Sequence, residues 1–174
     1  MKTMPNTGGG HGLTSVDDAG EKSPIEVIKG MVNHFAARHG RRPRVLVSHI
    51  GPGGQRRALN QVAALFARRG FDVDIAPVGQ LPHQTAMMAI ENDVHMVCLL
   101  CAPDRQSRME TEVIDVLTDH DRREVLVAFF GETHPAGNHR QTSAGRSGPV
   151  AIRAAAADAD IIAILGKLTR QNLL

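Results

Sequence analysis

Short apolar runs alternate with amphipathic segments along most of this chain, and this alternation limits the possible folds more than any other feature. Strands are predicted at 44–50, 71–76, 94–101, 124–130 and 161–165. Apolar residues at helical spacing predict helices between them, at about 59–70, 82–92, 108–120 and 150–157. Strict alternation of strand and helix predicts right-handed crossovers and a doubly wound, five-stranded parallel sheet, so the expected fold class is α/β.

One more helix is expected ahead of the first strand. The run Ser23-Pro24-Ile25-Glu26 combines an N-cap serine, a proline at the first helical position and a glutamate three residues after the cap. The apolar residues that then share one helical face are Ile25, Ile28, Val32 and Phe35. We therefore predict a disordered leader over 1–22, an amphipathic helix over 23–40 and a single domain over 41–174.

Composition excludes several classes of function. The formal net charge is only +2, and the acidic and basic residues are interspersed, so no charged run marks a nucleic-acid or membrane surface. Five phenylalanines, with no tryptophan or tyrosine, do not supply the exposed rings on which single-stranded nucleic acids stack. There is no apolar stretch near 18 residues and no leader typical of secretion, so we expect a cytoplasmic protein without a membrane partner.

The two cysteines, Cys98 and Cys101, have the spacing of a redox or metal half-site. They also lie in a predicted buried strand, where residues three apart point to opposite faces of the sheet. Two thiols on opposite faces cannot share a ligand or form a disulfide easily. We therefore interpret them as core residues.

Ligands of doubly wound sheets bind outside the carboxyl ends of the strands. That rule selects the loops at 49–54, 76–81, 101–107 and 131–148. The first of them is rich in glycine, but it lacks the Gly-Lys-Ser/Thr of a P-loop and the third glycine of the dinucleotide motif. An anion cradle at Gly51–Gly54 and a tight turn without a ligand both remain open.

Three stretches, read in order and spacing, carry a more specific resemblance. They are Arg-Pro-Arg-Val-Leu-Val at 42–47, Gly-Phe-Asp-Val-Asp-Ile-Ala-Pro at 70–77 and Glu-Asn-Asp-Val-His at 91–95. From about residue 42 to 117 the chain resembles the cobalamin-binding domain, or small subunit, of the methylmalonyl-CoA mutase family. The resemblance implies a flavodoxin-like (Rossmann-like) domain that buries the dimethylbenzimidazole tail of cobalamin. It also implies a lower cobalt ligand from the histidine of an Asp-x-His-x-x-Gly motif.

The residues that the resemblance would assign to cobalamin differ in this chain. Aligned on Ile50-Gly51, the three motif positions hold Gly53, Gln55 and Ala58. The other family positions, at the ends of the third, fourth and fifth strands, correspond to Leu100, to Phe130-Gly131 and to Gly166-Lys167-Leu168-Thr169. A glutamine is a poor substitute for an axial imidazole, and a phenylalanine ring would occupy the path of the tail. We therefore expect any cobalamin to bind weakly or base-on, without the usual histidine ligand.

His49 ends the first strand and is the candidate for a substitute cobalt ligand. The cofactor-binding candidates are His49, Gly51, Gly53, Gly54, Gln55, Leu100, Ala102 and Gly131. Other histidines are interpreted as packed or surface residues (His34, His39, His95 and His120) or as members of the polar 131–148 loop (His134 and His139). That loop is expected to be either a lid or a solvated segment.

The sequence supplies no acid–base pair or activated nucleophile, so we expect no catalysis by this chain alone. The first hypothesis is a cobalamin-binding-type module, a subunit of a cobalamin-dependent isomerase (mutase) if it belongs to an enzyme. The alternatives are a ligand-free structural or regulatory subunit and a sensor of another anionic ligand. Only nine residues follow Leu165, so the family's closing helix is expected to be missing. We therefore expect a homo-oligomer, or a mutase-like or GTPase partner, to cover that face.

Overall fold

The computed structural model describes residues 22–54, 56–131, 150–152 and 157–171. Within them, one parallel sheet has the strand order β2-β1-β3-β4-β5. Its strands are β1 (Arg44–His49), β2 (Asp72–Ile75), β3 (Met96–Leu100), β4 (Leu126–Phe130) and β5 (Val150–Ile152). This strand order and the parallel pairing confirm the predicted flavodoxin-like α/β fold.

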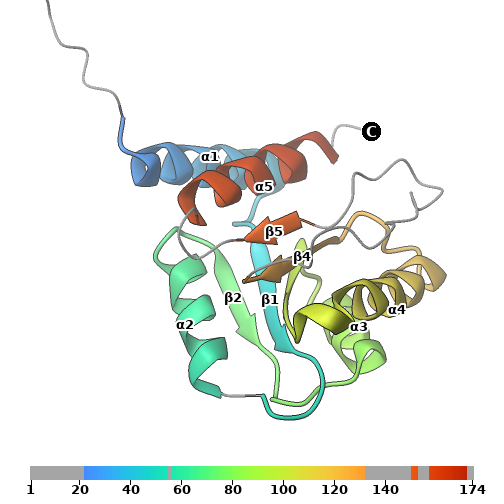
Figure 1. The fold of residues 1–174 in the computed structure, drawn as a ribbon. Helices are drawn as coiled ribbons and strands as arrows, with labels where there is room; N and C mark the ends of the chain where they lie inside the picture. The colour runs from blue at the N-terminus through green and yellow to red at the C-terminus, as the bar shows by residue number, and fades with distance from the viewer. Residues whose placement is uncertain (1–21, 55, 132–149, 153–156, 172–174) are drawn as a thin grey trace, which may run out of the picture.

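Helices pack on both faces of the sheet (Figure 1). They are α1 (Pro24–His39), α2 (Arg56–Ala67), α3 (Pro82–Glu91), α4 (Gln106–Asp119) and α5 (Ala157–Gln171), with a short 3-10 helix, η1 (Pro103–Arg105), before α4. α1, α2 and α5 share one buried cluster with the sheet, and α3 and α4 share the other. None of the helices in the described ranges is long and apolar enough to cross a membrane.

The side chains of β3 alternate between these two clusters. Met96, Cys98 and Leu100 face α1, α2 and α5, whereas Val97 and Leu99 face α3 and α4. Cys98 is fully buried, and Cys101 packs beside the opposite cluster, so the two thiols are separate and free as predicted. Burial raises the pKa of the Cys101 thiol to about 11, which removes the thiolate character that redox or metal chemistry needs.

α1 begins with the predicted capping box. The Ser23 hydroxyl accepts a hydrogen bond from the Glu26 backbone N–H at 3.4 Å, and the Glu26 carboxylate accepts one from the Ser23 N–H at 2.8 Å. The helix ends at Gly40, whose φ of +71° suits glycine. Ile28, Val32 and Phe35 are buried as expected, but Ile25 is 44% exposed, because it lies in the first turn beyond the neighbouring elements. The leader predicted over 1–22 lies outside the described residues, apart from residue 22.

The prediction for the C-terminal part is wrong. The sequence pattern predicts a helix over 150–157 and the fifth strand over 161–165, whereas β5 is Val150–Ile152 and residues 161–165 lie in α5. The buried residues of α5 recur at helical spacing: Ala157, Ile161, Ile164, Leu165 and Leu168. α5 packs against α1, and the two helices lie side by side over the sheet (Figure 1).

This correction removes two inferences from the sequence. The closing helix that was expected to be missing is present as α5, and it covers the sheet face for which a partner was expected. Gly166 lies inside α5, so Gly166–Thr169 cannot be the stretch that follows the fifth strand.

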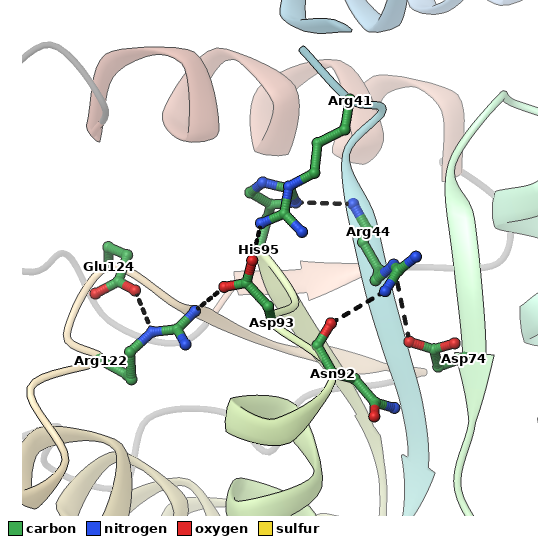
Figure 2. A network of polar contacts seen from close by, with 8 residues as sticks. All are labelled: Arg41, Arg44, Asp74, Asn92, Asp93, His95, Arg122 and Glu124. Atoms are coloured by element: carbon green, nitrogen blue, oxygen red, sulfur yellow. Dashed lines mark hydrogen bonds and ion pairs between the residues drawn. The ribbon is translucent and has the colours of Figure 1, made fainter. Parts of the chain in front are cut away.

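A polar network joins the loops at the amino ends of the strands (Figure 2). Asp93, just before β3, accepts from Arg41 at 2.5 Å and from Arg122 at 2.7 Å. Arg122 also donates to Glu124 at 2.5 Å. Partial burial opposes ionisation of Asp93, but the ion pairs with Arg122 and Arg41 outweigh it and hold the pKa of the carboxyl below its usual value. The network thus connects the end of α1 to the starts of β3 and β4.

His95 holds α1 against the sheet from the same edge. The Arg44 backbone N–H donates to His95 Nδ1 at 2.9 Å, and the imidazole meets the Phe35 ring edge-on with 5.0 Å between centroids. Burial lowers the pKa of His95 to about 4, and the nearby Arg41 adds to this effect. The predicted role of His95 as a packed residue is confirmed.

The free energy of unfolding is expected to fall as the pH drops from about 6.5 to 4, because His95 stays neutral when folded but gains a proton when unfolded. The contribution of His95 to the free energy of unfolding is fully present above the pKa of the unfolded histidine and is lost on acidification. Urea unfolding at several pH values measures this loss of unfolding free energy. In His95→Gln the loss is expected to be smaller than in wild type by on the order of 1 kcal/mol, allowing for solvent screening. His34→Gln, at an exposed position on α1, is the control. Equal pH dependence in wild type and His95→Gln would contradict the prediction.

Candidate functional site

The loops at the carboxyl edge are joined to one another by backbone hydrogen bonds. The Ile50 N–H donates to Leu100 O at 3.0 Å, so the loop after β1 stays attached to β3. The Gly51 N–H donates to Gln80 O at 3.1 Å, and the Gln80 N–H donates to His49 O at 3.1 Å, which attaches the loop after β2 as well. The loops after β1 and β2 and the end of β3 are therefore held together.

These hydrogen bonds weaken the case for an anion cradle at Gly51–Gly54. The Gly51 N–H is used by Gln80, and Pro52 has no N–H to offer. Gly51 and Gly53 have φ values of +93° and +82°, so a tight turn is reason enough for glycine at both positions. Among the described residues of this loop, only two backbone donors, at Gly53 and Gly54, remain for a ligand.

His49 lies beneath this loop. Its Nδ1 is buried and has no hydrogen-bond partner among the described residues. Gly54 lies directly against the ring: a Cβ at this position would be 2.5 Å from Nδ1 and 2.8 Å from Cγ. Gly54 is thus a glycine for a steric reason, and the imidazole is held between the sheet and the loop.

Two further predicted residues lie beside His49 at the ends of neighbouring strands. Leu100 is opposite His49 in the β1–β3 register, and the pairing of Leu99 with Phe129 places Phe130 next to Leu100. Leu100 is 9% exposed and belongs to the cluster shared by α1, α2 and α5, against which Phe130 also packs. This corner of the sheet edge is filled by apolar side chains.

The remaining candidates are spread along the edge. Ala102 is exposed just before η1, and Gly131 follows β4 with a φ of +116°. Gln55, His134 and His139 lie outside the described residues. No three histidine, cysteine or acidic side chains of the described part of the chain gather in a way that would hold a metal ion.

Sequence reasoning missed the contributions of Gln80 and Arg105. Gln80 closes the loop after β1, and the Arg105 guanidinium comes within 3.6 Å of where a Cβ on Gly51 would lie. Both residues belong to loops that the carboxyl-edge rule had selected. The rule identifies the loops, but it does not say which backbone groups and side chains join them.

Comparison with known proteins relates this chain to methylmalonyl-CoA mutases. It is 41% identical over 118 residues to the methylmalonyl-CoA mutase large subunit of Streptomyces virginiae, which is 68% of this chain and 16% of that protein. It is 38% identical over 116 residues to the mitochondrial mouse enzyme and 31% identical over 113 residues to the Escherichia coli enzyme, again 16% of each. These alignments extend beyond the stretch 42–117 in which the resemblance was expected to lie.

The chain spans about a sixth of the length of these relatives. No protein-family model matches it. A cobalamin-binding protein from Desulfitobacterium hafniense DCB-2 has a TM-score of 0.47 and 13% identity, over 66% of this chain and 56% of that one. The sequence comparisons show that about two thirds of this chain is similar to one part of the methylmalonyl-CoA mutases, and the strand order of its sheet is that of a flavodoxin-like fold.

Proposed function

We propose that this chain is a cobalamin-binding-type module that acts with a partner protein and holds cobalamin without the histidine ligand expected from its family. The observation that carries the proposal is the apolar corner at the ends of β3 and β4, formed by Leu100 and Phe130. The resemblance would place the buried tail of the cofactor at these family positions. The residues present do not fit that mode of binding, because they fill the space and supply no polar partner.

The side chains at the motif positions also favour binding without a histidine ligand. The motif position that would hold a carboxylate is Gly53, which has no side chain to orient a ligating imidazole. In base-on cobalamin the dimethylbenzimidazole tail is itself the lower cobalt ligand. The protein then has to supply neither a nitrogen ligand nor a slot for the tail. We therefore propose base-on binding over the strand ends.

An exposed apolar rim borders this edge. Val78 is 41% exposed and Leu81 is 60% exposed, on either side of the Gln80 that is hydrogen-bonded to the first loop. Apolar groups exposed next to a candidate cofactor site favour contact with a macrocycle or with a partner's surface. Since the chain matches only a sixth of each mutase, we propose that a separate domain or polypeptide supplies the substrate-binding residues. The partner we propose is a mutase-like protein or its GTPase.

A second candidate function is a ligand-free structural or regulatory subunit. It is favoured by the contacts that the edge already makes, where the first loop bonds to Gln80 and the apolar corner is filled. These contacts need no cofactor, and His49 Nδ1 is the buried polar atom of the described edge that they leave without a partner. Cobalamin binding therefore separates the two candidates.

Gel filtration with hydroxo-, methyl- and adenosylcobalamin tests the proposed function. We expect each to co-elute with the full chain at micromolar protein with an unshifted, base-on visible spectrum. Absence of co-elution with all three would refute cobalamin binding and leave the ligand-free subunit. A shifted spectrum that His49→Ala abolishes, and His34→Ala at the exposed α1 position does not, would instead identify His49 as the cobalt ligand.

Gly54→Ala tests whether the first loop holds the His49 ring. The added methyl group is expected to destabilise the protein by about 1 kcal/mol, because it overlaps the imidazole and forces ring or loop to shift. In a His49→Ala background the same substitution is expected to cost close to nothing, since the overlapping ring is absent. Chemical unfolding of the four proteins measures this coupling. An equal cost in both backgrounds would show that the loop position does not depend on His49.

A further inference from the structure

The outward face of α2 forms an open, basic groove that begins in the first turn of the helix, next to the loop at 49–54. The groove has a volume of about 870 Å³, and its floor includes Asn60, Gln61 and Ala64. Arg57 lies at one end and Arg68 at the other. The Arg68 N–H donates to Ala64 O at 3.1 Å, so the helical path continues to this residue. Arg57 and Arg68 are therefore about 16 Å apart along the axis and on the same side of the helix.

Most of the positive charge of this groove has no acidic partner in the part of the chain that the structure describes. α2 contains no acidic residue, and neither Arg57 nor Arg68 makes an ion pair with any described residue. Arg69 differs, because its guanidinium pairs with Asp158 at the start of α5 and donates to Leu65 O at 2.9 Å. Arg69 is thus fixed as part of the wall, whereas Arg57 and Arg68, at the two ends, have no ion-pair partner within the described ranges.

The position of Arg57 is unfavourable for the helix itself. Arg56 and Arg57 lie in the first turn, where the helix dipole is positive and favours acidic side chains. The stability of α2 therefore does not explain why arginines occupy these two positions. An anionic partner would offset the unfavourable placement.

We infer that this groove is a docking site for an acidic helical segment of a partner protein. A helix lying along α2 over the small Ala64 side chain would place carboxylates about 11 residues apart next to Arg57 and Arg68. The amide side chains of Asn60 and Gln61 supply hydrogen bonds between the two charged ends. The inference rests on the proposed function only in requiring a partner protein, and it involves no cobalamin contact.

Fluorescence anisotropy with a defined probe tests the inference on the full chain. The probe is a labelled, helix-stapled peptide of about 18 residues with glutamate pairs about 11 residues apart. We expect it to bind wild type in about 0.1 M salt. A peptide of equal composition with its glutamates about 5 residues apart, on different helix faces, is expected to bind more weakly.

The variant Arg57→Glu/Arg68→Glu is expected to bind the first peptide about tenfold more weakly. The matched control is Arg38→Glu/Arg123→Glu, which makes the same change in charge at two exposed arginines elsewhere. It is expected to bind within about twofold of wild type. Circular dichroism melts check that both variants are folded.

Three results would overturn the inference: no binding of the peptide by wild type, equal loss in both double variants, or tighter binding of a DNA duplex than of the peptide. Cobalamin co-elution is measured on the same preparations. Because Arg57 lies in the first turn of α2, beside the loop at 49–54, cobalamin binding is judged on the wild type. Its absence there would refute the proposed cofactor and leave the peptide result standing.

Discussion

β3 pairs with β1 on one side and with β4 on the other, and all five of its residues are buried. Parallel neighbours cannot be joined by tight turns, so each crossover must carry a helix across one face of the sheet. The chain therefore needs two apolar layers, which are the cluster beneath α1, α2 and α5 and the cluster beneath α3 and α4. The same constraint gathers the carboxyl ends of the strands at one edge and their amino ends at the other. The candidate site and the network of Figure 2 are both consequences of this arrangement.

The first four strands and the helices up to α4 could be predicted from sequence, because each has a clear period and a recognisable end. The C-terminal part could not. Residues 161–165 form an unbroken apolar run, which in a short window is compatible with a buried strand or with one side of a buried helix. Length decides between them: the buried positions continue to Leu168 at helical spacing, which is too long for a strand of this sheet. Asp158 and Asp160 in the first turn were a further signal for a helix start.

The candidate site was predicted at the level of loops and strand ends, but not at the level of contacts. His49, Leu100 and Phe130 could be placed at the carboxyl edge because each lies at, or one residue before, the end of a predicted strand. No sequence pattern indicates that Gly51 donates to Gln80, or that Gly54 lies against the His49 ring. Both contacts join segments whose relative placement depends on the tertiary fold. Both glycines were therefore interpreted as parts of a sequence motif. In the structure, Gly51 is explained by its positive φ, and Gly54 is explained by its close contact with the His49 ring.

The stretches that carry the family resemblance include most of the network at the amino ends of the strands, whereas the positions that depart from it lie at the carboxyl ends. Runs 42–47, 70–77 and 91–95 contain Arg44, Asp74, Asp93 and His95, which belong to the network at the amino edge in Figure 2. Gly53, Leu100 and Phe130 lie at the carboxyl edge. The amino edge fixes α1 and the starts of the strands. Resemblance at these residues therefore reports on the framework of the domain. What the chain binds has to be decided from the residues at the strand ends.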